Sequence, residues 1–166
     1  MRNIRILYVC TEDEIKKVED IATNVWNEHY ISIIEKEQIE YMVSKFQSRD
    51  AIKRQIKNDG YKYCILNFKG SNVGYIAFKK EGNQIYLSKL YVEKEYRNNG
   101  IAEIAIKHLL HICDRDGLEK IWLNVNKKNC KSIEIYEKMG FVKTAEKVTN
   151  IGSGYIMDDY IMEKAV

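Results

Sequence analysis

The stretch Arg97-Asn98-Asn99-Gly100-Ile101-Ala102 decides the fold, because a strand pattern ends just before it and a helix pattern begins within it. Residues 85–92, Ile-Tyr-Leu-Ser-Lys-Leu-Tyr-Val, have the β-branched and aromatic content of a strand. Gly100 marks a position where the backbone takes a positive φ or lies close to another group. The stretch is therefore predicted to be a tight loop between a strand and a helix that starts at Ile101.

Such a loop is a natural seat for an anion. The first turn of the helix would leave backbone N–H groups unpaired, and their partial positive charge faces the loop. Asn98 and Asn99 tolerate left-handed conformations, so successive N–H groups could form a concave nest, to which Arg97 adds a full charge. We interpret the loop as a pyrophosphate site; the alternative is an ordinary strand-to-helix turn, in which glycine is common.

The chain before residue 85 is predicted to form strands and three helices. Thr11 and Glu14 have the spacing of a capping box, and Ser48 is placed to cap a later helix. The predicted elements are a strand from Arg2 to Cys10, helices from Thr11 to about Asn27, from Glu35 to Phe46 and from Ser48 to Gly60, and strands at 61–68 and 73–79. With the strand at Ile85, the last two strands are expected to form an antiparallel meander.

After the loop, a helix is predicted from Ile101 to Gly117, and a strand at 120–125. A strand, a helix and a strand over this length form a right-handed crossover, so the strands ending at Val92 and Val125 are expected to be parallel. A short helix capped by Asn129, and a hairpin of strands at 141–149 and 155–162, complete the chain. This order predicts a single α+β domain over residues 1–166, with a mixed sheet.

The composition narrows the class of protein. The 166 residues are 45% hydrophobic and 31% charged, as in soluble globular domains, and a net charge of +3 without a basic run argues against nucleic-acid binding. No apolar stretch approaches the ~18 residues of a membrane span, and the N-terminus lacks the apolar core of a signal peptide, so we expect no membrane and a cytoplasmic location. The four cysteines are far apart, so neither zinc nor disulfides are expected.

A second pattern makes the loop more specific. Asn129, Ser132 and Tyr136 stand at offsets of three and seven, which places them on one face of the short helix. That helix follows the parallel strand, so its exposed face can approach the gap beyond Val92, and ligands favour such crevices at strand ends.

These residues resemble the GCN5-related N-acetyltransferase (GNAT) superfamily, whose loop signature here reads Arg97-x-x-Gly100-x-Ala102. The run Tyr136-Glu137-Lys138-Met139-Gly140-Phe141 after Asn129 is equally typical of it. The resemblance implies a mixed, mostly antiparallel sheet of about seven strands, with a central parallel pair splayed apart and flanked by helices. It covers nearly the whole chain, and the N-terminal half is the looser part.

The resemblance also implies a co-substrate, acetyl-coenzyme A, bound between the splayed strands without a metal. The pantetheine arm would pair with the backbone of the strand, and the pyrophosphate with the loop N–H groups. The residues so assigned are Leu90, Tyr91, Val92, Arg97, Asn98, Asn99, Gly100, Ile101 and Ala102, with Asn129 and Ser132 at the pantetheine region and Tyr136 beside the sulfur.

The implied chemistry is direct attack of an acceptor amine on the thioester. The departing thiolate needs a proton or a hydrogen bond, and Tyr136 is the predicted general acid. An alkylamine is mostly protonated at neutral pH, so a base is also needed. Some relatives use a Glu on the strand that here reads Tyr-Leu-Ser-Lys at 86–89, which has no carboxylate; the candidates are Glu28, His29 or a chain of water molecules.

The acceptor wall is expected to come from aromatic and polar side chains of the first helices and from the tip of the last hairpin. They are Trp26, His29, Tyr30, Gln38, Tyr41 and Tyr155, and the alternative is that the aromatics belong to the core. The C-terminal run from Gly154 to Lys164 resembles a bacterial subgroup that includes polyamine acetyltransferases. Asp158 and Asp159 could attract a cationic acceptor or form a solvated edge.

The leading hypothesis is therefore an N-acetyltransferase for a small amine such as a polyamine. A protein N-terminus or lysine is an alternative acceptor. A non-catalytic acyl-coenzyme A sensor is a different class of function, which the missing strand carboxylate favours and Tyr136 opposes. The sequence does not identify the physiological acyl group, and it does not decide whether the protein forms a homodimer.

Overall fold

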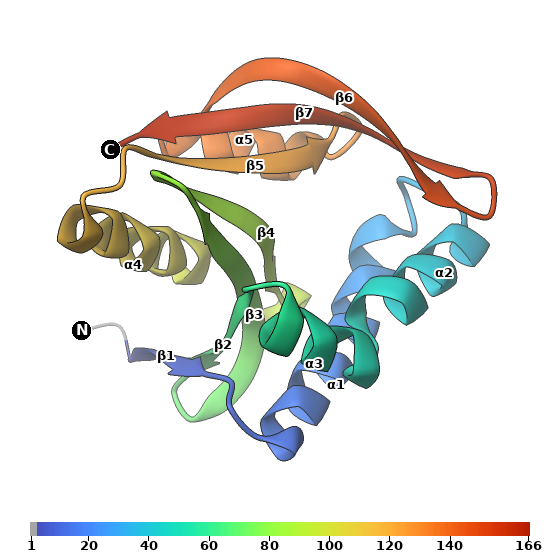
Figure 1. Ribbon diagram of the computed structural model, residues 1–166. Helices are drawn as coiled ribbons and strands as arrows, with labels where there is room; N and C mark the ends of the chain where they lie inside the picture. The colour runs from blue at the N-terminus through green and yellow to red at the C-terminus, as the bar shows by residue number, and fades with distance from the viewer. Residues whose placement is uncertain (1–2) are drawn as a thin grey trace.

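The computed structural model describes residues 3–166 and contains one seven-stranded sheet with the strand order β1-β2-β3-β4-β5-β7-β6 (Figure 1). Its strands are β1 (Ile4–Tyr8), β2 (Lys62–Phe68), β3 (Ser71–Glu81), β4 (Gln84–Val92), β5 (Lys120–Asn126), β6 (Val142–Gly152) and β7 (Tyr155–Ala165). All neighbours are antiparallel except β4 and β5. The predicted mixed sheet with one parallel pair is confirmed.

The helices are α1 (Glu12–Tyr30), α2 (Lys36–Gln47), α3 (Arg49–Asn58), α4 (Ile101–Asp116) and α5 (Cys130–Lys138), with a 3-10 turn η1 (Lys94–Tyr96) before the loop. The predicted caps are present: Thr11 and Glu14 form a capping box, and Asn129 accepts a hydrogen bond from the Ser132 N–H. The first helix is longer than predicted, because its buried positions continue through Trp26 to Tyr30.

The structure differs from the sequence-based expectation in one strand pairing and in the length of the last turn. The antiparallel meander has four strands, since β1 pairs with β2, and the turn between β6 and β7 contains only Ser153 and Gly154. Positive φ angles at both residues make this short turn possible. Arg2, where the first strand was expected to begin, lies outside the described residues.

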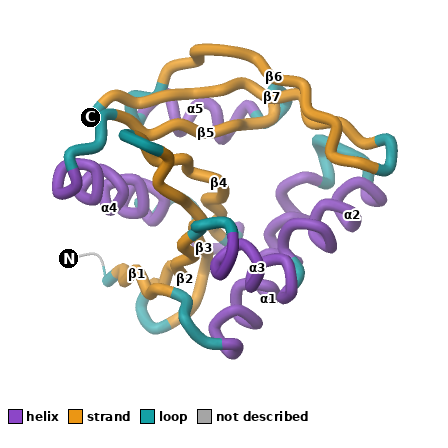
Figure 2. The backbone as a smooth tube through the Cα atoms, in the orientation of Figure 1, coloured by secondary structure: helices purple, strands orange, loops and turns teal. Residues whose placement is uncertain are grey.

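The helices cover the two faces of the sheet separately (Figure 2). On one face, α4 and α5 pack on a core that includes Phe78, Leu109 and Phe141. On the other, α1, α2 and α3 cover a second core that includes Tyr63, Tyr75 and the N-terminal helices' own apolar residues. Within residues 3–166, no helix is long and apolar enough to cross a membrane.

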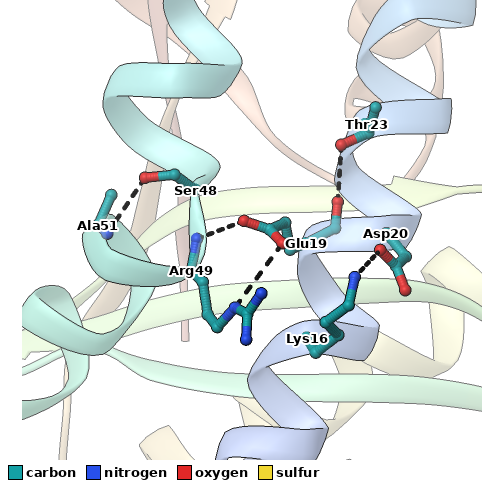
Figure 3. Close-up of polar contacts among 7 residues, drawn as sticks. All are labelled: Lys16, Glu19, Asp20, Thr23, Ser48, Arg49 and Ala51. Carbon is teal, nitrogen blue, oxygen red and sulfur yellow. Dashed lines mark hydrogen bonds and ion pairs between the residues drawn. The ribbon is translucent and has the colours of Figure 1, made fainter.

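Helices α1 and α3 are connected by polar contacts at the start of α3 (Figure 3). Ser48 caps α3 by accepting from the Ala51 N–H at 3.3 Å, and the Arg49 N–H donates to a carboxylate oxygen of Glu19 on α1 at 2.6 Å. Acidic side chains at a helix N-terminus are favourable because of the helix dipole. Glu19 thus holds α3 against α1, and both helices cover the same face of the sheet.

The parallel pair β4 and β5 is joined over only part of its length. Gln84–Leu87 pair with Lys120–Leu123, but both strands continue beyond these pairs. A register shift between β3 and β4 leaves Ser88 without a partner on β3, which is the pattern of a β-bulge. A bulge bends and twists its strand, so β4 turns away from β5 after Leu87.

Candidate active site

A cleft lies where β4 and β5 separate. It encloses about 360 Å³ of space, part of it open to solvent. Its walls come from β4, β5, the end of α1 and one face of α5, and they include Ser88, Leu90, Asn124, Tyr30, Ser132 and Tyr136. The structure therefore brings the predicted face of α5 to the predicted strand end.

The predicted anion loop has the expected backbone. Asn98 and Gly100 take positive φ angles of 66° and 75°, whereas Asn99 does not, and its side-chain amide donates to the Tyr96 carbonyl at 2.8 Å. Gly100 is the N-cap of α4 and has no side chain to satisfy the first N–H groups. The N-terminus of α4 is thus free of a side-chain cap, as an anion seat requires.

Arg97 makes contacts that the sequence did not predict. Its guanidinium donates to both carboxylate oxygens of Glu28, at 3.1 and 2.5 Å, and its Nε donates to the Val92 carbonyl at 3.0 Å. Burial opposes ionisation of Glu28, but the hydrogen bonds and charge of Arg97 lower the pKa of that carboxyl below its usual value. The pair joins the end of α1 to the loop before α4.

His29 also joins two elements. Its Nε2 lies 2.7 Å from Nδ2 of Asn129, and the Asn129 Oδ1 is the acceptor that caps α5. The amide nitrogen therefore donates to an unprotonated Nε2. Burial, and secondarily the charge of Arg97, lower the pKa of His29, which favours that neutral form. The Asn129 amide nitrogen is thus already engaged by His29.

Tyr136 is partly buried on α5 and packs edge-on against Phe141, with ring centroids 5.6 Å apart. Burial raises the pKa of its phenol, with a further contribution from Tyr30. The hydroxyl is therefore protonated at neutral pH, as a proton donor must be.

The predicted acceptor wall is only partly formed. Tyr30 lines the cleft and its hydroxyl lies 2.8 Å from that of Tyr91. Trp26 differs from expectation: it is 2% exposed, and its indole N–H donates to the Tyr75 hydroxyl at 2.8 Å, so it belongs to the core. Trp26, His29 and Tyr30 share one face of α1, and the rings of Trp26 and Tyr30 are 5.6 Å apart, but Trp26 lies one turn earlier in the helix and is covered by the core.

The other predicted wall residues meet at the far end of the same face. The rings of Tyr41 on α2 and Tyr155 on β7 are 5.2 Å apart, and the Tyr41 hydroxyl donates to the Ile151 carbonyl at 2.8 Å. Gln38 donates to the Ile156 carbonyl at 3.0 Å. Helix α2 and the β6–β7 hairpin therefore touch directly, as Figure 1 shows at the right of the molecule.

Sequence reasoning missed two polar residues of the cleft. Ser88 is the unpaired residue of the bulge, and Asn124 on β5 donates from Nδ2 to the Tyr86 hydroxyl at 3.1 Å. The available signal for Asn124 was a polar residue between the buried apolar residues Leu123 and Val125 of β5. In the described part of the chain, no group of three or more His, Cys, Asp or Glu side chains is arranged to hold a metal ion.

Two curated relatives resemble part of the sequence. An uncharacterised N-acetyltransferase of Mycobacterium bovis is 30% identical over 94 residues, which are 56% of this chain and 60% of that protein. The ribosomal protein bS18 alanine N-acetyltransferase of Escherichia coli is 26% identical over 88 residues, which are 51% of this chain and 58% of that protein. The matched region thus spans about 60% of the length of these relatives.

Solved structures resemble the whole chain. The PaiA N-acetyltransferase of Thermoplasma acidophilum, in complex with coenzyme A, superposes with a TM-score of 0.80 at 23% identity, over 98% of this chain and 99% of that one. The spermidine/spermine N-acetyltransferase SpeG of Vibrio cholerae gives 0.69 at 15% identity, over 98% and 94%. At these identities the likeness shows a shared fold.

The sequence matches the acetyltransferase (GNAT) family over residues 19–141. That range runs from α1 through the separated strands and the anion loop to the end of α5. This chain belongs to the acetyltransferase (GNAT) family.

Proposed function

We propose that the protein transfers an acetyl group from acetyl-coenzyme A to a primary amine by direct attack. The observation that carries the proposal is the cleft between β4 and β5, with Tyr136 on its wall, beside the uncapped N-terminus of α4. The sheet is continuous from β1 to β7, which supports treating residues 1–166 as one acyl-coenzyme A N-acyltransferase domain.

The coenzyme would enter along the separated strands. In the proposal, the backbone of Leu90 and Val92 pairs with the pantetheine amides, and the N–H groups of residues 98–102 bind the pyrophosphate. Asn129 and Ser132 face the pantetheine from α5. The guanidinium of Arg97 binds Glu28 and the Val92 carbonyl within the protein. In the proposal, its positive charge also lies close to the phosphates of the coenzyme.

The proposed chemistry assigns one proton to Tyr136. As the amine nitrogen bonds to the carbonyl carbon and the C–S bond breaks, the phenol O–H hydrogen-bonds to the departing sulfur and supplies its proton. The developing oxyanion would be polarised by a backbone N–H of residues 90–92, an interaction that can contribute several kcal/mol. The protonated state of Tyr136 supports an acid rather than a base.

The proposal assigns the general acid to one residue but assigns the general base to no single side chain. Glu28 is ion-paired with Arg97, and the Nε2 lone pair of His29 accepts from Asn129, so each is engaged in this arrangement. His29 would take a proton only after releasing Asn129. These contacts favour a water chain as the first route by which the amine loses its proton, with Glu28 and His29 as its possible ends.

We further propose that the acceptor is a small amine rather than a folded protein. Direct contacts between α2 and the β6–β7 hairpin, through Tyr41 and Gln38, close one side of the acceptor face. A chain crossing that face would have to break them, whereas a small molecule would not. The structural relatives named above include an enzyme for spermidine and spermine, and the sequence relatives one for a protein alanine.

Titration calorimetry with acetyl-coenzyme A, followed by a thiol-release assay, tests the proposal. The acceptor panel should contain polyamines, amino acids, aminoglycosides and peptides with free N-termini. We expect coenzyme binding and release of coenzyme A with a small amine. Binding without release for any amine would favour a sensor, and release only with peptides would favour a protein acetyltransferase.

A further inference from the structure

Two buried side-chain oxygen atoms, one on β5 in the cleft wall and one on the neighbouring strand β7, lack a hydrogen-bond donor. Among the described residues, they are the buried side-chain oxygens or nitrogens without a partner: Oδ1 of Asn124 and Oδ1 of Asp159. Asp159 is 7% exposed, although most buried carboxylates are paired. An unsatisfied buried acceptor costs roughly 1 to 3 kcal/mol, so two of them near one site need an explanation.

The strand register places the two side chains on the same face. Asp159 on β7 is opposite Asn126 on β5, and Asn124 stands two residues along from Asn126. Side chains two residues apart along a strand share a face, and such diagonal neighbours are roughly 7 Å apart. Burial, with a smaller electrostatic contribution from Asp159, raises the pKa values of Tyr30 and Tyr86.

Among residues 3–166, no cationic side chain forms a hydrogen bond with Oδ1 of Asp159. Lys147 on β6 is opposite Asp159 in register, but its side chain is exposed and does not pair with Oδ1. Lys127 binds Asp158 at 3.0 Å and Glu146 at 3.2 Å instead. The Asn124 amide nitrogen is directed to Tyr86, which leaves its carbonyl oxygen as an acceptor.

We infer that Asp159 and Asn124 form the subsite that binds the amino group of the acceptor as an ammonium ion. An ammonium carries three N–H donors and no acceptor, so it can satisfy both oxygens at once. With N–H···O distances of about 2.9 Å on two sides, it bridges diagonal neighbours. Asn124 also lines the cleft that contains Tyr136, so the bound nitrogen stands beside the proposed thioester site. This inference rests on the proposed function and specifies its substrate contact.

The inference is tested by amine binding, measured separately from turnover. Butylamine, 1,4-diaminobutane and spermidine are titrated by calorimetry into the protein, both free and saturated with coenzyme A, and butan-1-ol is the uncharged control. We expect the amines to bind and the alcohol not to bind. Asp159→Asn and Asn124→Leu should each weaken amine binding at least tenfold, and Asp159→Asn should change coenzyme A affinity less than twofold.

Asp158→Asn is the matched control, because Asp158 is the exposed neighbour that pairs with Lys127. It should change amine affinity less than twofold. Equal loss in both Asp variants would reduce the effect to general surface charge and overturn the inference, as would unchanged amine binding in Asp159→Asn or no amine binding at all. If coenzyme A fails to bind while amines still bind through Asp159, the proposed function fails and the subsite stands.

A second measurement does not depend on a folded variant. In the wild-type protein, the carboxyl carbon resonance of Asp159 is followed by nuclear magnetic resonance while butylamine is added. Burial, and then the neighbouring charge of Asp158, raise the pKa of Asp159 to about 6, and Lys147 opposes this. A bound ammonium should lower that midpoint, and an unmoved midpoint at saturating butylamine would contradict the inference.

Discussion

The imidazole of His29 and the side-chain amide of Asn129 are hydrogen-bonded at 2.7 Å, which connects the last turn of α1 to the first turn of α5. Asn129 is one of the residues that line the cleft between β4 and β5. A ligand that uses the Asn129 amide must therefore replace one hydrogen bond, which contributes about 1 kcal/mol net.

Acidification should break this contact. The pKa of His29 is below its usual 6.5, so stability from the neutral ring is complete above pH 6.5 and is lost as pH falls toward the folded-state value. A protonated imidazole cannot accept from Asn129. Nuclear magnetic resonance of both side chains should show them changing together, and His29→Phe should remove the Asn129 transition. Resonances of the Asn129 amide that stay unchanged while His29 is protonated would refute the linkage.

Replacement of Tyr136 by Phe should lower turnover and spare coenzyme binding. The change removes one hydroxyl and keeps the ring against Phe141. General acid catalysis contributes 10² to 10⁴-fold, so we expect kcat to fall at least about 100-fold. Stopped thiol-release assays give kcat, and calorimetry gives the acetyl-coenzyme A affinity, which should stay within about twofold. An unchanged kcat would remove Tyr136 from the mechanism.

Separating Arg97 from Glu28 should destabilise the protein modestly. The pair is bidentate, but its side chains are 33% and 36% exposed, so solvent screens much of the attraction. A double-mutant cycle with Arg97→Gln and Glu28→Gln should give a coupling of roughly 1 kcal/mol in urea unfolding. Zero coupling would mean that the two residues act independently.

An alanine at Gly74 should displace β4. A Cβ added at Gly74 would collide with the backbone carbonyl oxygen of Tyr91, on the strand that lines the cleft. A backbone atom cannot move aside as a flexible side chain can. We therefore expect the free energy of unfolding to fall by roughly 1 to 3 kcal/mol and coenzyme binding to weaken. Urea unfolding and calorimetry measure the two effects. A variant with wild-type values in both would show that β4 tolerates the shift.

Asp159→Asn should stabilise the unliganded protein above neutral pH. Because the pKa of Asp159 is raised to about 6 from 3.8, the folded state binds the proton more tightly than the unfolded state. The contribution of Asp159 to wild-type stability should therefore rise as pH falls from 7.5 toward 4, by roughly 2 kcal/mol, against the opposite contribution of His29. The Asn variant should lack this rise. Thermal unfolding at several pH values measures it, and parallel pH profiles for the two proteins would contradict the expectation.

The architecture was accessible from the sequence because it depends on local patterns. Capping by Thr11 and Asn129, the glycine at position 100 and the crossover from β4 to β5 all have signals within a few residues. Boundaries were less accurate where a buried position prolonged an element, as at Tyr30.

The side-chain pairs were not accessible in the same way. Arg97 with Glu28, and His29 with Asn129, join residues far apart in the chain, and either partner alone has several possible contacts. The β-bulge at Ser88 depends on the register with β3, which no local pattern reports. Trp26 was misplaced because residues on one helix face can meet different surroundings: Tyr30 lines the cleft, whereas Trp26, one turn earlier, is covered by the core.

The short junction between β4 and β5 also has a mechanical consequence. Four register pairs, from Gln84 with Lys120 to Leu87 with Leu123, are the ladder that connects β1–β4 to β5–β7. The sheet can thus be regarded as two cooperative opening units that meet at one seam. Amide exchange should be slowest inside each unit and faster at residues 88–92 and 124–126, and a ligand lodged in the seam would raise the opening free energy of both units together.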